Sequence, residues 1–179
     1  MASNMFLTRT FEQPLSVADV CERARSSEWC YLMHKVDWRG SLLATDGRTL
    51  ICWFIAADSE SVRIALRKSG ADIQFLWAGT VHEAPEPPVP NVLVDRSFQQ
   101  PVTFEEISSA ARAGAGCLRM HRVRYSRTFF SLDRRRMLCL YEAPDAESVR
   151  IAQREVALPH DSVWAFHTIG PEILGSAST

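Results

Sequence analysis

The amino-acid sequence alternates between two hydrophobic patterns, and both patterns recur in each half of the chain. Short runs rich in apolar and β-branched residues, such as Met5–Phe11 and Val92–Phe98, predict strands. Segments in which apolar residues recur at every third or fourth position, such as Val17, Val20 and Ala24, predict amphipathic helices. Each half of the chain therefore combines helices with strands.

Helix start signals lie at matching places in the two halves. Thr103 followed by Glu106 forms a capping box, in which each residue satisfies a free backbone N–H of the other. The predicted N-caps of the four helices are Ser16, Asp58, Thr103 and Asp145. In the second half, Gly114 and Gly116 predict the end of the first helix.

A long strand is predicted after the first helix of each half, over Cys30–Ala44 and over Cys117–Ser131. The later elements are predicted turns at Asp46-Gly47 and Asp133-Arg134, return strands at Leu50–Ala56 and Met137–Ala143, second helices after Asp58 and Asp145, and last strands with Trp77 and Trp164. If the first turn is centred on residues 46 and 47, Cys52 lies opposite Ser41 and not opposite Cys30. The order of elements in each half is β-α-β-β-α-β, the ferredoxin-like arrangement.

The two halves are similar in sequence as well as in pattern. Residues 4–84 align with residues 91–171 without a gap, and close to a third of the paired positions are identical. The hexapeptide Glu60–Ala65 recurs unchanged as Glu147–Ala152. Identity at this level over a domain-sized period predicts a duplication.

The duplication predicts a domain organisation. The first repeat is predicted over residues 1–84, a proline-rich linker over 85–90, the second repeat over 91–171 and a flexible tail over 172–179. A ferredoxin-like sheet carries helices on one face only, so its other face needs a cover. We therefore expect an α+β fold in which two ferredoxin-like repeats pack sheet to sheet, as an intramolecular dimeric α/β barrel.

Composition and charge narrow the classes of function. The net charge is −1 and 23% of the residues are charged, so binding to nucleic acid through a basic surface is not expected. No apolar run is long enough to span a bilayer, and no secretory signal precedes the first predicted strand. Five cysteines without a C-x-x-C pair predict reduced thiols and a cytoplasmic location. Association into a homo-oligomer remains open.

Most of the second half resembles a known family. The motifs are the stretch Cys139–Arg150, with its Tyr-Glu-Ala-Pro-Asp core, then Leu158-Pro159 and Val163-Trp164. These residues resemble the small nickel-binding, ferredoxin-like proteins known as domain of unknown function 4242. The first half matches only in outline, with Phe54 and Ile55 at the positions of the tyrosine and glutamate. The resemblance implies a dimeric ferredoxin-like fold and binding of a divalent metal, nickel.

Two histidines occupy equivalent positions in the repeats. His34 and His121 would approach each other across a two-fold axis, as metal ligands or as an acid–base pair. The alternative is a structural histidine that is hydrogen-bonded on a half-buried strand. Cys30 and Cys117 precede the histidines by four residues, which on a strand is roughly 13 Å and too far to share one ion.

Several polar residues of the second repeat correspond to apolar residues of the first. Glu142, Ser131 and Tyr141 align with Ile55, Ala44 and Phe54. A site that is present in only one repeat would produce this asymmetry, and so would relaxed drift of the first repeat. Glu142 is either a group with a raised pKa beside a cavity or the partner of Arg150 in an ion pair.

These observations lead to two hypotheses about function from different classes, and a third hypothesis is a module that only binds another protein. The first is a small metal-binding protein, with nickel held by His34 and His121. The second is a cavity enzyme, an isomerase, cyclase or lyase, that acts on a small anionic organic molecule with Glu142 or His121 as the general base. The residues predicted to bind its substrate are Tyr125, Ser131, Tyr141 and Arg150.

Overall fold

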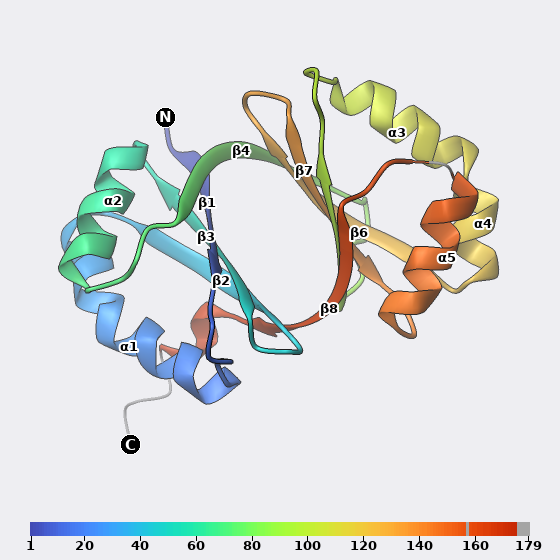
Figure 1. Ribbon diagram of the computed structural model, residues 1–179. Helices are drawn as coiled ribbons and strands as arrows, with labels where there is room; N and C mark the ends of the chain where they lie inside the picture. Colours follow the sequence, from blue (N-terminus) through green and yellow to red (C-terminus); the bar gives the residue numbers. More distant parts are fainter. Residues whose placement is uncertain (157, 175–179) are drawn as a thin grey trace. The chain divides into compact units, whose positions relative to one another are not determined.

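The computed structural model describes residues 1–156 and 158–174, and it divides into two compact units. Unit 1 combines Met1–Gly79 with the segment that starts at His167, and unit 2 is Thr80–Phe166 (Figure 1). The boundaries between the units fall inside two strands, and the proline-rich connector belongs to unit 2.

Unit 1 is an antiparallel sheet with two helices. Its elements are β1 (Ser3–Thr10), α1 (Val17–Met33), β2 (Asp37–Ala44), β3 (Thr49–Ala56), α2 (Ser59–Lys68) and β4 (Phe75–Glu83), whose last four residues belong to unit 2. Strand β1 lies between β3 and β4, and β2 pairs with the other side of β3. Helices α1 and α2 cover one face of this sheet (Figure 1).

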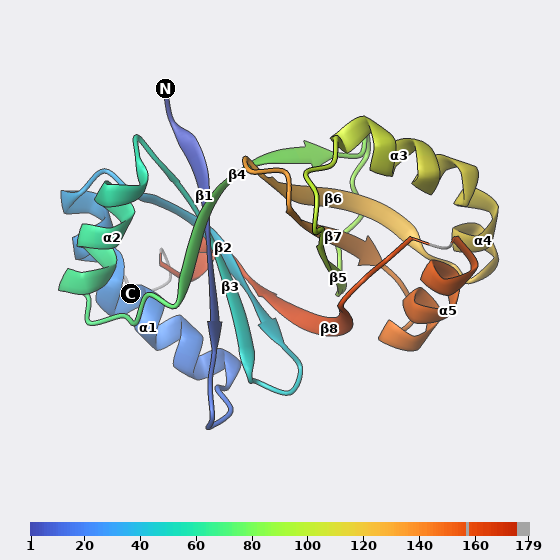
Figure 2. The same ribbon diagram turned by 45° about the horizontal axis from the view of Figure 1, so that its top comes forward.

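Unit 2 repeats this arrangement, with the first helix divided in two. Its elements are β5 (Val92–Ser97), α3 (Phe104–Ala113), α4 (Ala115–Met120), β6 (Arg124–Ser131), β7 (Arg136–Glu142), α5 (Ala146–Val156) and β8 (Ser162–Ile169), whose last three residues belong to unit 1. Strand β5 lies between β7 and β8, and β6 pairs with β7. The three helices lie on one face of the sheet (Figure 2).

The predicted order of elements is confirmed in unit 1, and unit 2 follows it with an additional helix, α4, before β6. The fold is a mixed α/β fold with antiparallel sheets. All four predicted N-caps accept a hydrogen bond from a backbone N–H of the first helical turn: Ser16, Asp58, Thr103 and Asp145. Caps of this kind satisfy N–H groups that have no partner inside the helix, which fixes where each helix begins.

The strand predicted over Cys30–Ala44 is wrong at its beginning. Helix α1 continues to Met33, and the strand starts only at Asp37. Lys35 ends the helix in the left-handed region, with φ of 54°, and the N–H of Val36 reaches back to the carbonyl of Tyr31 at 2.9 Å. This closure is common for glycine and rare for lysine, so the sequence carried no stop signal.

The same error occurs over Cys117–Ser131. Gly114 does end α3, as predicted, but the chain enters a second helix, α4, before the strand starts at Arg124. Arg122 closes α4 with φ of 57°. Gly114 is required at the junction because a Cβ there would overlap the side chain of Val156 in α5. Packing between helices therefore decides this break.

The hairpin register predicted for the cysteines is confirmed. Cys52 lies opposite Ser41 in the β2–β3 pair, and Cys139 lies opposite Thr128 in the β6–β7 pair. All five cysteines are free thiols. The first turn is tight because Gly47 adopts φ of 72°, a conformation that side chains disfavour.

The hydrophobic core of each unit lies between the sheet and its helices. In unit 1 the second helix contributes Val62, Ala65 and Leu66. In unit 2, Val149 and Ala152 take the same positions against Val92 and Val94 of β5. The predicted three- and four-residue spacing of apolar side chains therefore marks the buried face of these helices.

The predicted flexible tail over 172–179 is described only as far as Leu174, because residues 175–179 lie outside the described residues. Pro171–Ile173 form a short 3-10 helix, η1, and Ile173 and Leu174 pack against the core of unit 1. No helix in the described part of the chain is long and apolar enough to cross a membrane.

Candidate functional site

A cavity of about 560 Å³ lies inside unit 2. This volume is within the range of sites that bind small organic molecules. Its helical wall and its sheet floor are mostly apolar, with Phe104, Ile107, Ala111, Ala115, Leu118, Met137 and Leu158 among the lining residues. The polar residues that line it are His82, Glu83, Arg96, Ser108, Arg112, Tyr125, Thr128, Cys139 and Tyr141.

Arg96 places a positive charge in the floor of this cavity. It lies in β5 on the same face as Val92 and Val94, because side chains two residues apart in a strand share a face. Only 1% of the residue is exposed. Its guanidinium donates to the side-chain oxygen of Gln153 and to the carbonyl of Pro159, both at 2.5 Å.

The acceptors of Arg96 are neutral groups. Among the described residues no carboxylate forms an ion pair with it, and its Nε has no hydrogen-bond partner. Arginine stays protonated in proteins, so its charge remains uncompensated beneath the cavity. The field of this charge favours an anionic group in the space above it.

A β-bulge brings Tyr125 and Thr128 together. The pairing of β6 with β7 skips Ser126, so that residues three apart along β6 point to the same face. The hydroxyl of Tyr125 lies 3.1 Å from that of Thr128, which in turn donates to the sulfur of Cys139 at 3.5 Å. The bulge thus creates a short row of polar groups on the floor of the cavity.

The bulge also fixes the connector at the rim. The hydroxyl of Ser126 donates to the carbonyl of Pro88 at 2.7 Å, and the Ser126 carbonyl accepts from the N–H of Ala84 at 2.9 Å. The phenol of Tyr125 donates to the carbonyl of His82 at 2.9 Å. These bonds hold residues 82–88 against β6, where Ala84 and Pro85 line the cavity.

Both tyrosines of the cavity are neutral at physiological pH. Burial raises the pKa of Tyr125 to about 12. Burial also raises the pKa of Tyr141, which lies beside Arg96 and Gln153. Both phenols therefore keep their proton.

An aromatic pair forms part of the wall. The ring of His82 stacks on Phe104 of α3, with 3.8 Å between the ring centroids and 12° between the planes. Burial lowers the pKa of His82, which favours the neutral ring at physiological pH. The wall is therefore suited to a flat or aliphatic ligand.

The structure brings some of the predicted site residues together and separates others. Tyr125 and Tyr141 line the cavity. Glu142 is partly exposed and pairs with Arg124 at 3.3 Å, so Arg124 and not Arg150 is its partner. Ser131 accepts backbone N–H groups of the β6–β7 turn.

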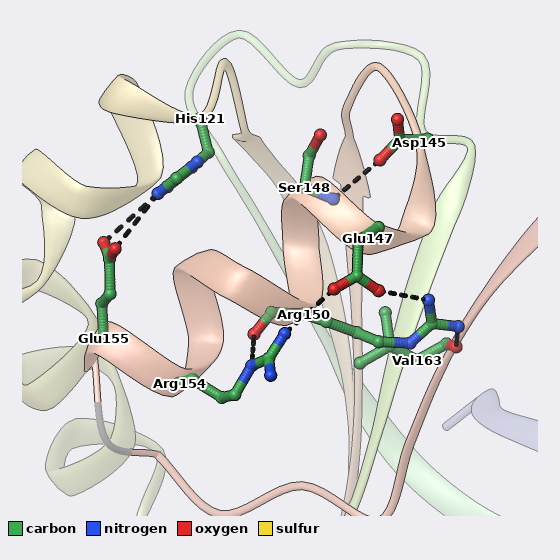
Figure 3. A network of polar contacts seen from close by, with 8 residues as sticks. All are labelled: His121, Asp145, Glu147, Ser148, Arg150, Arg154, Glu155 and Val163. Carbon is green, nitrogen blue, oxygen red and sulfur yellow. Dashed lines mark hydrogen bonds and ion pairs between the residues drawn. The ribbon is translucent and has the colours of Figure 1, made fainter.

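Arg150 lies in a network of polar contacts along α5, and His121 pairs separately with Glu155 of the same helix (Figure 3). Arg150 pairs with Glu147 at 3.0 Å and donates to the carbonyl of Val163 at 2.8 Å. His121 follows α4 and lies 3.3 Å from Glu155. Neither residue lines the cavity.

The nickel hypothesis can be tested against the donors present. His34 and His121 lie in different units, so their predicted pairing stays a prediction. Each histidine follows its cysteine by one helical turn, not by four strand positions, which corrects the distance expected from the sequence. Even so, the described residues contain no group of three or more His, Cys, Asp or Glu side chains placed to hold a metal. The pair of His121 and Glu155 supplies two donors, which do not by themselves fit a resident nickel ion.

Sequence reasoning missed Arg96, Thr128, Cys139 and His82. A signal for Arg96 existed: an arginine stands at the same alternation position as buried valines, and Arg9 repeats it in the first half. No such signal existed for Thr128, because the bulge that turns it towards Tyr125 is not visible in the sequence.

The segment that carries most of the cavity is similar to a known family. Residues 93–165, which carry most of the cavity, match the model of the nickel-responsive SCO4226-like proteins. This segment is similar to the SCO4226-like family. This match confirms the resemblance to a nickel-associated family, and the SCO4226-like segment coincides with most of unit 2. No curated protein sequence matches the chain significantly.

Solved structures share the fold. The chlorite dismutase from Candidatus Nitrospira defluvii matches with a TM-score of 0.53 at 12% identity, over 97% of this chain and 94% of that chain. The protein TA0507, provisionally described as a chlorite dismutase, matches with a TM-score of 0.53 at 13% identity, over 99% of both chains. At such low identity these likenesses show the fold and not a shared activity.

Proposed function

We propose that unit 2 binds a small, largely apolar organic molecule with an anionic group. The observation that carries the proposal is a cavity of about 560 Å³ above a buried arginine that has no carboxylate partner. The apolar body of the ligand would lie against Phe104, Ile107 and Leu118. Its anionic group would face the floor, where the charge of Arg96 and the neutral phenol of Tyr141 lie.

The proposed function is binding, and turnover is a further step that the placement of Glu142 and His121 does not support. A general base has to reach the proton that it removes. Glu142 pairs with Arg124 and His121 with Glu155, and neither lines the cavity. An acid–base role for either residue stays a prediction from the sequence.

The test uses 8-anilinonaphthalene-1-sulfonate, an aromatic anion whose fluorescence rises in apolar surroundings. We expect saturable binding with one site per chain. Ala111→Phe, which fills the cavity from α3, should abolish it. Ala113→Phe makes the same change on the exposed side of the same helix and should leave binding intact. Equal binding by both variants would refute the proposal.

A second comparison tests the charge. Arg96→Met should weaken binding of the anionic probe about tenfold and leave binding of a neutral analogue, N-phenyl-1-naphthylamine, nearly unchanged. A parallel loss of both probes would indicate a collapsed cavity and not a lost charge. Unchanged binding of the anion would show that Arg96 does not select the ligand.

Nickel binding is a second candidate function, favoured by the family match of residues 93–165. The donors that it would use on unit 2 are His121 and Glu155, with the remaining ligands from outside this pair. Titration calorimetry with Ni²⁺ on protein without an affinity tag tests it. His121→Ala should weaken the binding of Ni²⁺. Unchanged affinity for Ni²⁺ in this variant would exclude the pair of His121 and Glu155 as the site.

Three features that the two units share support the predicted duplication. Helices and strands follow each other in a similar order, the helix caps lie at aligned positions, and a bulge lies at the same place in β2 and β6. The packing of the two repeats sheet to sheet, as an intramolecular dimeric α/β barrel, stays a prediction.

A further inference from the structure

Unit 1 contains a smaller cavity at the position equivalent to that of unit 2. Its volume is about 80 Å³, and it lies between α1 and the sheet. It is lined by Arg9, Val20, Arg23, Ala24, Ser26, Ser27, Tyr31, Trp38, Ser41, Leu50, Cys52, Ser69, Gly70 and Ala71. In the repeat alignment Arg9 corresponds to Arg96, Ser41 to Thr128 and Cys52 to Cys139. The floors of the two cavities are therefore built alike.

Arg9 is buried with little to accept its hydrogen bonds. It is 7% exposed and lies on the helix-covered face of β1 with Met5 and Leu7. Its one recorded acceptor is the sulfur of Cys52, 3.9 Å from Nη2, and its Nε has no partner in the part of the chain that the structure describes. A guanidinium carries five N–H donors, and burying them without acceptors is costly.

The comparison with unit 2 shows what Arg9 lacks. Arg96 donates to Gln153 and to the carbonyl of Pro159. The residue aligned with Gln153 is Leu66, whose side chain is buried in the apolar core and has no acceptor atom. The residue aligned with Pro159 is Asp72, and among the described residues Arg9 makes no hydrogen bond to its backbone carbonyl. Unit 1 thus keeps the arginine and lacks both of these hydrogen bonds.

The walls of the small cavity carry no carboxylate, because no Asp or Glu is among the lining residues. Its four serines donate their hydroxyl protons within the protein: Ser26 and Ser27 to the carbonyl of Arg23, Ser69 to the carbonyl of Leu66 and Ser41 to the sulfur of Cys52. The guanidinium of Arg9 is therefore the group that is left to bind an anion. Burial raises the pKa of Tyr31 to about 12, so its phenol also keeps its proton.

A second guanidinium lies close by. The Cζ atoms of Arg9 and Arg23 are 5.7 and 5.8 Å from the centroid of the same ring, that of Phe11. Arg23 is exposed, and the carboxylate that it influences is Asp19 at the start of α1. The two cations therefore raise the positive potential at the cavity without a carboxylate between them.

We propose that unit 1 binds a small oxyanion at Arg9, of the size of phosphate, sulfate or acetate. One water needs roughly 10–15 Å³ of such space, so a cavity of about 80 Å³ accommodates an ion of this size but not the larger ligand proposed for unit 2. The anion accepts the hydrogen bonds of Arg9 that Gln153 and Pro159 accept from Arg96 in unit 2. The site is independent of the ligand proposed for the larger cavity.

The test is titration calorimetry of the full chain with inorganic phosphate, and then with sulfate and acetate, at constant ionic strength. The wild type should bind one anion. Arg9→Met should weaken the binding at least tenfold. Leu66→Gln introduces the acceptor that unit 2 has and should also weaken the binding, because Arg9 then has an internal partner. Arg39→Met, the same change at an exposed arginine of unit 1 that does not line the cavity, should leave phosphate binding unchanged.

Circular dichroism checks that each variant is folded. If Arg9→Met does not fold, Leu66→Gln still tests the proposal. Absence of phosphate, sulfate and acetate binding in the wild type would overturn the proposal. Full binding by both Arg9→Met and Leu66→Gln would also overturn it, since the anion would then lie elsewhere. Loss of binding in Arg96→Met, with Arg9→Met unaffected, would move the site to unit 2.

Discussion

Removal of the main acceptor of Arg96 should destabilise unit 2 measurably. Gln153→Leu deletes a hydrogen bond of 2.5 Å to a guanidinium that is 99% buried, since only 1% of the residue is exposed. Hydrogen bonds to charged groups contribute about 1.5–3 kcal/mol, and leucine gains some apolar burial in return, so we expect a loss of about 2 kcal/mol. The backbone accepts leucine here, because Leu66 occupies the aligned position of unit 1.

The assay is equilibrium urea unfolding at neutral pH, followed by circular dichroism. Hydrogen exchange of β5 and β7 assigns the loss to unit 2. The melting temperature should fall by about 4–8 °C for a chain of this size. The double variant Arg96→Met with Gln153→Leu replaces both partners by apolar groups and should recover most of the lost stability, because no charge remains buried.

Two results would contradict this reasoning. The first is a Gln153→Leu variant within about 0.5 kcal/mol of the wild type, which would mean that the bond contributes nothing net. The second is a double variant at least as unstable as the sum of the single ones. Such additivity would show that Arg96 and Gln153 do not interact, whatever their distance.

Two further perturbations test other features of the fold. Gly47→Ala should lower the free energy of unfolding in urea by about 2–4 kcal/mol, because φ is +72° and a Cβ would overlap the carbonyl of Leu15. Gly70→Ala, at φ of +75° with open space around it, should lower it by only about 1 kcal/mol, and equal losses would refute the steric argument. Burial lowers the pKa of His82 below its usual 6.5, so the unfolded chain binds a proton at a higher pH than the folded chain does. The stability of the protein should therefore decrease as the pH falls below about 6.5. His82→Phe, which keeps the stack on Phe104, should reduce this decrease, and an unchanged dependence of stability on pH would exclude His82 as its source.

Much of the fold was predictable because local signals specify it. The capping residues Ser16 and Thr103 fixed helix starts through hydrogen bonds within one turn. Turn position alone gave the register that sets Cys52 opposite Ser41. The prediction was wrong where helix ends depend on unusual backbone conformations, at Lys35 and Arg122.

The candidate site was predictable only in part. Tyr141 was selected because it differs from its counterpart in the first repeat, and it lines the cavity together with Tyr125, which was also predicted to bind the substrate. The same reasoning selected Glu142 and Ser131, which lie in a surface ion pair and in a turn. A difference between repeats marks a change, but it does not tell which face of the sheet the changed residue occupies.

The sequence by itself determined the starts of the four capped helices and the hairpin register, because these depend on neighbours a few residues apart. Tertiary structure decided which polar side chains share a cavity. The bulge at Ser126 turns Thr128 towards Tyr125, and Val156 requires glycine at the α3–α4 junction. Whether Gln153 or Leu66 faces the buried arginine likewise becomes visible only when helix and strand are packed together, because contacts between distant segments leave no periodic signal in the chain.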